Sequence, residues 1–126
     1  MNIKVTNVRV MQTSTAFECK LWLDGKPVGL VSNDGRGGCH DWRPIRAEAD
    51  WRTPEGKAQT TAAFTLMNDA QRRIEAAAKT AEVSDFEAAD FIVSALVDGV
   101  KGWNAAVDYC RSTQVEYEAQ YASEEV

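Results

Sequence analysis

Cysteine, histidine and long apolar runs are scarce in this chain of 126 residues. The three cysteines, Cys19, Cys39 and Cys110, lie far apart and form no CxxC pair. This spacing argues against a disulfide framework and favours reduced thiols in a cytosol. No apolar run approaches the roughly 20 residues that span a bilayer, and the alternating residues 1–10 are not typical of a signal peptide. We therefore expect a cytoplasmic protein without a membrane segment.

The single histidine, His40, stands between Cys39 and Asp41. Zinc needs three or four converging ligands, and adjacent residues of an extended segment point to opposite sides. Because the Cys39 and His40 side chains would point to opposite sides, they are also not expected to act together as a catalytic nucleophile and its base. We expect no metal, no cofactor and no catalytic site, and an enzyme that uses His40 and Asp41 is the least favoured function.

Charge is unevenly divided along the chain. Residues 1–57 carry nine Lys and Arg against seven Asp and Glu, a net of +2, whereas residues 58–126 carry five against twelve, a net of −7. A net acidic chain repels phosphate backbones, so we expect no non-specific binding of nucleic acid. The carboxylates either keep the protein soluble or attract a basic protein surface. The acidic candidates for such an interface are Glu75, Glu82, Asp90 and Asp108.

The first third of the sequence has the pattern of an antiparallel sheet. Residues 3–10 are rich in β-formers, with a bulge or bend expected at Thr6-Asn7. Phe17, Cys19, Leu21 and Leu23 alternate with Glu18, Lys20 and Trp22, which is typical of a half-buried strand. Asp24-Gly25 predicts a tight hairpin, and a third strand ends near Ser32. The firmest structural prediction is a three-stranded meander over residues 2–32.

Helical patterns follow from residue 53. Thr53-Pro54 is typical of a helix start, although Gly56 moves the expected stable helix to about Gln59. Small residues then repeat at helical spacing from position 63 to position 77 and suit close packing. The segment between Pro44 and Trp51 is expected to be a short helix or irregular.

Residues 84–87, Ser-Asp-Phe-Glu, fit a capping box. The helix that it would open is expected to bury Phe86, and a last helix follows a break near Gly99. One core is predicted from both halves of the chain: Phe17, Leu21, Leu23, Leu30, Ile92 and Leu96.

The predicted fold class is therefore α+β, with a three-stranded antiparallel sheet followed by about three α-helices packed on it. A single domain is expected over residues 1–126. It would contain the sheet and a glycine-rich loop at 2–42, a helical part at 43–121 and a frayed end at 122–126. The helices offer more apolar surface than three strands can cover, so a homodimer is also expected.

The segment 32–42 holds three of the eight glycines. Glycines after a strand can turn backbone amides toward an anion, with Arg36 and Arg43 as phosphate contacts and His40 beside them. The sequence contains neither GxxxxGK[ST] nor GxGxxG, because His40 occupies the last position of the second motif. The alternative is a wide turn whose glycines adopt left-handed conformations.

Three tryptophans, Trp22, Trp42 and Trp51, are candidate binding residues. Trp22 lies opposite the buried face of its strand, so it either packs under residues 44–51 or forms an exposed patch beside Arg43 and Arg46. Tryptophan and arginine are enriched among binding hot spots. The sequence leaves both interpretations open.

The segment 2–42 resembles small, mostly uncharacterised proteins of phages, prophages and plasmids. The shared features are a strand, the hairpin Asp24-Gly25-Lys26 and a loop with Asn33-Asp34-Gly35 followed by Gly37-Gly38. The resemblance implies a mobile-element origin and a place in the cytoplasm of a bacterial host. Such accessory proteins often bind a host or defence protein, as anti-CRISPR inhibitors do.

The function expected first is stoichiometric inhibition of a bacterial protein through protein–protein contact. The alternative is a binder of a small ligand or nucleotide, a sponge that uses the glycine-rich loop.

Overall fold

The computed structural model describes residues 1–11 and 15–124, with side chains described as far as residue 113. Four strands form one antiparallel sheet in the order β1-β2-β3-β4: β1 Ile3–Val10, β2 Phe17–Leu23, β3 Lys26–Asn33 and β4 Asp41–Arg43. Three helices follow: α1 Pro54–Thr80, α2 Ala88–Val97 and α3 Trp103–Glu124. The predicted α+β class is confirmed, and β4 is a fourth strand that the sequence did not predict. Position 125 and position 126 of the expected frayed end lie outside the described residues.

The strands form where alternation and turn chemistry predict them. Asp24 and Gly25 both have positive φ, 52° and 82°, as a tight hairpin requires. The register of β1 against β2 shifts between Thr6 and Arg9, and Asn7 there has a φ of 52°. The predicted hairpin and the predicted bulge are therefore confirmed.

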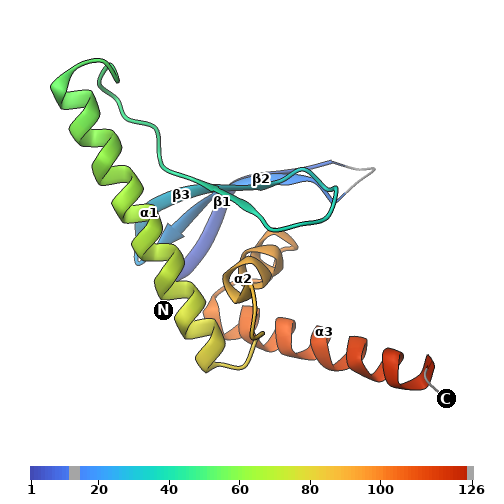
Figure 1. The fold of residues 1–126 in the computed structure, drawn as a ribbon. Coiled ribbons are helices and arrows are strands. Elements are labelled where there is room, and N and C mark those ends of the chain that lie inside the picture. Colours follow the sequence, from blue (N-terminus) through green and yellow to red (C-terminus); the bar gives the residue numbers. More distant parts are fainter. Residues whose placement is uncertain (12–14, 125–126) are drawn as a thin grey trace.

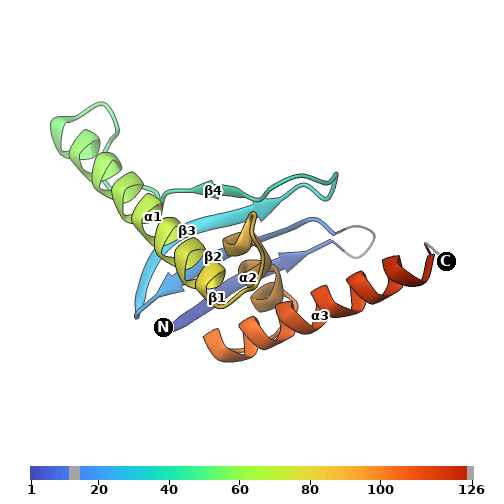
Figure 2. The same ribbon diagram turned by 60° about the horizontal axis from the view of Figure 1, so that its bottom comes forward.

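All three helices lie on one side of the sheet (Figures 1 and 2). The core between them contains Ile3, Cys19, Leu21, Leu23 and Val31 from the sheet. From the helices it contains mainly small and branched residues: Ala70, Ile74, Ala78, Ala88, Ala89, Ile92, Val93, Ala95, Leu96, Ala106, Val107 and Cys110. Small residues let the helices approach the sheet closely, as the stripe at 63–77 suggested.

Helix α1 begins at Pro54 and not near Gln59. The Thr53 side chain accepts a hydrogen bond from the Gly56 N–H at 3.0 Å, and Pro54 occupies the first turn. Gly56 does not weaken this start, because the chain before the helix packs against it. A Cβ at Gly56 would lie 1.9 Å from the Asp50 carbonyl oxygen.

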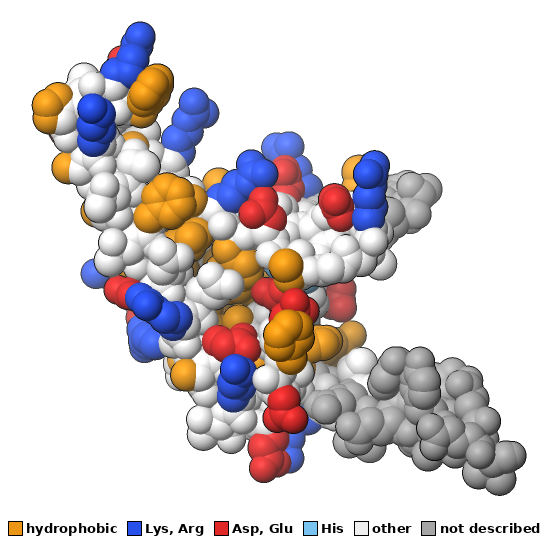
Figure 3. All heavy atoms as spheres, in the orientation of Figure 1, with side chains coloured by type: hydrophobic (Ala, Val, Ile, Leu, Met, Phe, Trp, Pro, Cys, Tyr) orange, Lys and Arg blue, Asp and Glu red, His pale blue; other side chains and the backbone are white. Residues whose placement is uncertain are grey.

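The first half of α1 projects beyond the sheet together with the irregular segment 44–53 (Figure 1). Hydrophobic and basic side chains are exposed on this projection (Figure 3). Phe64, Leu66 and Trp51 are 47%, 40% and 71% exposed. These exposures do not test the expected homodimer, which stays a prediction.

Two of the expected core residues are exposed. Leu30 is 41% exposed, because a register shift near Val28 lets Val28 and Val31 point inward while Leu30 points outward. Phe86 is 73% exposed, because α2 begins after it, at Ala88. Phe17 is half-buried at the margin of the core. The remaining predicted members, Leu21, Leu23, Ile92 and Leu96, are buried.

Candidate functional site

The glycine-rich loop between β3 and β4 is shaped by its own side chains. Asn33 Oδ1 accepts a hydrogen bond from the Gly35 N–H at 2.8 Å, and Asp34 Oδ1 accepts one from the Arg36 N–H at 3.0 Å. Gly35 has a φ of 78°, and a Cβ there would lie 2.8 Å from the backbone nitrogen of Ala16. The loop is therefore a wide turn whose glycines adopt left-handed conformations.

Beyond the turn, hydrogen bonds attach the loop to α2. Asp90 Oδ2 accepts from the His40 backbone N–H and Asp90 Oδ1 accepts from the Trp42 indole N–H, both at 2.8 Å. His40 Nε2 lies 2.8 Å from Ser94 Oγ, and Asn33 Nδ2 donates to His40 Nδ1 at 3.1 Å. We call these five residues the loop–α2 network.

The structure thus brings three predicted site residues together, His40, Trp42 and Asp90. Each is half-buried, and each uses its polar atoms on another part of the chain. The His40 ring also packs edge-on against Phe17 at 4.8 Å between ring centroids. This arrangement stabilises the docking of α2 and leaves these residues few groups for a ligand.

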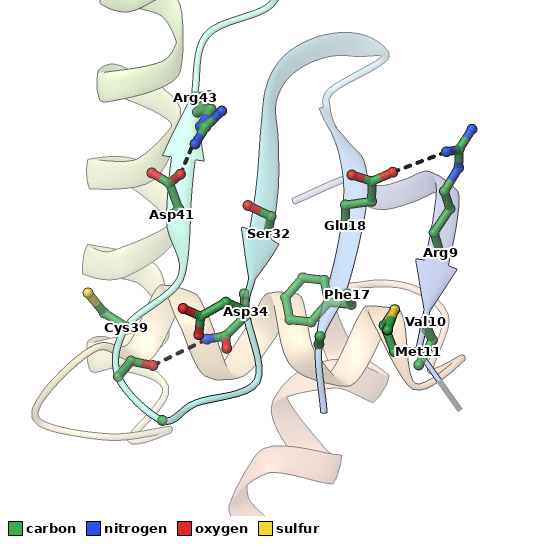
Figure 4. A pocket seen from close by; sticks show the side chains of 14 residues that line it. Arg9, Val10, Met11, Phe17, Glu18, Ser32, Asp34, Cys39, Asp41 and Arg43 are labelled. Carbon is green, nitrogen blue, oxygen red and sulfur yellow. Dashed lines mark hydrogen bonds and ion pairs between the residues drawn. The ribbon is translucent and has the colours of Figure 1, made fainter. Parts of the chain in front are cut away.

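A shallow hollow of about 830 Å³ lies beside the same loop at the end of the sheet (Figure 4). Its arginines are paired within the hollow, Arg9 with Glu18 at 3.5 Å and Arg43 with Asp41 at 2.8 Å. Asp34 adds a third carboxylate, and Arg36 does not line the hollow. Three carboxylates against two paired arginines would repel a phosphate group.

A second group of side chains surrounds the start of α2. The Ser84 side chain makes a local turn, accepting from the Phe86 N–H and donating to the Phe86 carbonyl. The predicted capping box is therefore wrong. Glu75 of α1 caps the helix instead, accepting from the N–H groups of Ala88 at 3.0 Å and Ala89 at 2.6 Å. Phe86 stands outside the helix with its ring in solvent.

We define the Phe86 patch as Glu82, Asp85, Phe86, Glu87 and Phe91. Phe86 and Phe91 are 73% and 51% exposed. Glu82 lies 4.0 Å from Arg111, whereas no ion pair joins Asp85 or Glu87 to any described residue. Figure 3 shows acidic side chains gathered around hydrophobic ones over α2. The patch therefore combines exposed aromatic rings with unpaired negative charge.

A hollow of about 390 Å³ adjoins the Phe86 ring, between α1, α2 and the glycine-rich loop. Its lining residues are Phe86, Cys39, Gln71, Arg72, Lys79, Glu75 and Glu87, with His40 and Asp90 of the loop–α2 network. An apolar side chain of a partner could enter it next to the ring. Glu82 of the Phe86 patch was a candidate from the sequence, but the exposed Phe86 was missed because Ser-Asp-Phe-Glu matches a capping box. The available signal was the run of four carboxylates from Glu82 to Asp90.

The other predicted site residues are dispersed. Trp22 and Arg43 lie on the sheet face away from the helices, where Arg43 pairs with Asp41. Trp51 is on the projection, and Arg36 and Asp108 are exposed on the loop and on α3. Glu75 serves as the cap of α2. The structure therefore does not unite the predicted candidates into one site.

The titratable groups do not form a reactive cluster within the described residues. Burial raises the pKa of the Cys19 and Cys110 thiols to about 11, so both stay protonated near neutral pH. The Arg73 guanidinium, 2.8 Å away, lowers the pKa of the exposed Asp24 carboxyl. No three His, Cys, Asp or Glu side chains of the described part could hold a metal ion. In the same part, no helix is long and apolar enough to cross a membrane.

The sequence matched no protein-family model, and comparison with curated proteins and with solved structures also gave no match. Function therefore has to be inferred from the side chains described above.

Proposed function

We propose that this chain is a protein-binding module whose Phe86 patch docks on a basic surface of a bacterial protein and blocks it by stoichiometric contact. The observation that carries the proposal is the Phe86 ring, 73% exposed between the unpaired carboxylates of Asp85 and Glu87. The proposal involves no chemical reaction.

Exposed aromatic rings support a binding role on energetic grounds. Burial of a phenylalanine side chain contributes roughly 1.5–3 kcal/mol, and nothing within the described residues covers Phe86. A contiguous exposed apolar surface with a polar rim is typical of interaction sites. The hollow beside the ring offers room for a partner side chain, as at the centre of many interfaces.

The charge of the patch supports a basic partner. Asp85 and Glu87 flank Phe86 in the sequence, and neither side chain is in an ion pair with a described residue, whereas Glu82 lies 4.0 Å from Arg111. Unpaired carboxylates at the rim of an interface accelerate the approach of an oppositely charged surface. A basic partner with an apolar side chain at its centre therefore fits the patch best.

The choice of a bacterial target follows from the resemblance of residues 2–42 to phage and prophage proteins. Small proteins of that kind often inhibit host or defence proteins, anti-CRISPR inhibitors among them. The alternative of a nucleotide sponge has less support, because the hollow at the glycine-rich loop contains more carboxylates than arginines.

The test compares matched variants in a pull-down from nuclease-treated bacterial lysate. Phe86→Ala removes the central ring, and Trp51→Ala is the control, because Trp51 is an equally exposed aromatic residue at 71% on the projection. We expect one protein at equimolar ratio on the native chain and on Trp51→Ala. With Phe86→Ala we expect at least about a tenfold loss of affinity for the purified partner, as for a hot-spot residue.

Three results would contradict the proposal. The partner could bind Phe86→Ala as tightly as the native chain, or it could bind only through Trp51. A nucleotide could also be retained through purification and lost on Arg36→Ala, with no protein partner recovered. Circular dichroism of each variant checks that the fold is intact.

A further inference from the structure

Within the part of the chain that the structure describes, the sheet face away from the helices is uncovered. All three helices cover the opposite face, and no described element packs over this one (Figure 2). A cross-strand row of Thr6, Lys20, Leu30 and Arg43 runs over it from β1 to β4. A hollow of about 540 Å³ lies along the same row. We call this surface the outer sheet face.

Trp22 lies on the outer sheet face between two lysines. Lys4 Nζ is 5.0 Å and Lys20 Nζ 5.3 Å from the centre of its ring, within the range of cation–π attraction. The Trp22 indole N–H donates to Thr6 Oγ1 at 2.8 Å, which fixes the ring on the sheet. Trp22 therefore does not pack under residues 44–51. It is half-buried and holds two ammonium groups on one surface.

The charges of this face are unbalanced. Arg9 pairs with Glu18 and Arg43 pairs with Asp41, which leaves Lys4 and Lys20 without a carboxylate partner among the described residues. The outer sheet face is thus positive, although the whole chain has a net charge of −5.

Strand β1 borders this face as an edge strand, and among the described residues it pairs with β2 alone. Alternate residues of an edge strand present unpaired N–H and C=O groups, which can accept a further strand. The half of β1 from Asn7 to Val10 is exposed, and Val10 and Met11 are 58% and 60% exposed. An added strand would cover these apolar side chains and lie beside Lys4 and Arg9.

We infer that β1 binds an extended, acidic protein segment as a fifth strand of the sheet. Backbone hydrogen bonds along the edge would hold the segment, as in other cases of strand addition. The carboxylates on one face of the bound strand would lie near Lys4 and Lys20. The apolar residues on its opposite face would cover Val10. This site is separate from the Phe86 patch and opposite to it in charge.

The other possible occupants fit less well. A second copy paired antiparallel through β1 would bring Lys4 and Arg9 of both chains onto one face, where like charges repel. A nucleic acid strand carries its charge along its whole length and would extend toward the acidic part of the chain, residues 58–126 with a net charge of −7. A short acidic peptide can instead be confined to the basic outer sheet face and need not extend toward the acidic part of the chain.

Fluorescence anisotropy with a labelled peptide of alternating Glu and Val, seven residues long, tests this inference on the full chain. We expect saturable binding that the double variant Lys4→Glu/Lys20→Glu weakens at least about tenfold. Lys101→Glu is the matched control, because Lys101 is exposed before α3, away from the sheet face, and should leave binding unchanged. The same peptide N-methylated at alternate residues lacks edge donors and should not bind.

Four outcomes would overturn the inference. They are equal binding of a Lys-Val peptide, equal binding of the N-methylated peptide, no effect of Lys4→Glu/Lys20→Glu, and displacement of the peptide by a dT oligonucleotide at a lower concentration than by unlabelled peptide. Phe86→Ala should bind the Glu-Val peptide like the native chain, so this result is independent of the function proposed for the Phe86 patch.

Discussion

The loop–α2 network and the Phe86 patch are neighbours that use their side chains in opposite ways. In the network, an imidazole, an indole and a carboxylate are half-buried and bonded to one another across two parts of the chain. In the patch, two phenylalanines are exposed, and the carboxylates of the exposed Asp85 and the half-buried Glu87 have no ion-pair partner among the described residues. Polar groups with internal partners stabilise a fold, whereas exposed apolar groups are available for binding. The contrast places internally bonded side chains and exposed, unpartnered ones in adjacent segments.

The largest difference in stability is expected between substitutions on the buried face of α2 and substitutions on its exposed face. Ile92 is 0% exposed and Phe91, its neighbour, is 51% exposed. We expect Ile92→Ala to lower the free energy of unfolding by about 2–5 kcal/mol, and Phe91→Ala to lower it by less than about 1 kcal/mol. Urea denaturation followed by circular dichroism measures both. Equal losses would show that Phe91 also belongs to the core.

Substitution of Asp90 in the loop–α2 network should destabilise the fold far more than substitution of Asp85 in the Phe86 patch. Asp90→Ala removes the acceptor of the His40 and Trp42 N–H groups, so we expect a loss of about 2–4 kcal/mol in unfolding free energy. Asp85→Ala, which removes no hydrogen bond or ion pair of the described residues, should change it by less than about 0.5 kcal/mol. A loss under about 1 kcal/mol for Asp90→Ala in the same urea assay would mean that water replaces the carboxylate.

Within the glycine-rich loop, substitution of the bonded His40 should destabilise the fold more than substitution of the exposed Arg36. His40→Ala removes the hydrogen bonds to Ser94 and Asn33, and we expect about 1–2 kcal/mol of destabilisation with faster amide exchange in residues 39–42. Arg36→Ala should have an effect within about 0.5 kcal/mol, because its side chain is exposed. Slower exchange, or a larger loss for Arg36→Ala, would contradict the assignment of His40 to the network.

The smallest effect on stability is expected for Glu82→Lys and Asp108→Lys. Both residues are exposed, so the free energy of unfolding should change by less than about 0.5 kcal/mol. Glu82→Lys should nevertheless slow association with the partner, most strongly at low salt, because Glu82 belongs to the Phe86 patch. Stopped-flow association at two salt concentrations measures this. Asp108→Lys should slow association less, and the opposite order would move the interface to α3.

The sequence predicted those elements that depend on local chemistry. Alternation located β2, Asp24-Gly25 located the hairpin, and Thr53 located the cap of α1. Leu30 was placed in the core because a register shift in β3 cannot be recognised from alternation alone. Phe86 was placed in the core because Ser84 was expected to cap a helix that included Phe86. The cap comes instead from Glu75, eleven positions before Phe86 in the sequence, and the helix begins after Phe86.

The candidate site was less predictable than the fold. His40, Trp42 and Asp90 were each selected from the sequence, but for separate reasons, and the hydrogen bonds that unite them span about 50 residues. Lys4 and Lys20 were not selected, because their significance depends on the register that places them on both sides of Trp22. Cross-strand proximity is a property of pairing and not of sequence distance.

The hydrogen bonds of the loop–α2 network also bear on the order of folding. The hairpins β1–β2 and β2–β3 join neighbouring segments, and their closure has a small entropic cost. The bond from His40 to Asp90 closes a loop of 50 residues and needs α2 to be present. During synthesis the sheet can therefore form before α2 leaves the ribosome. Until α2 docks, the inner sheet face and the indole of Trp42 lack their cover, and this interval is when we expect the nascent chain to be most susceptible to aggregation.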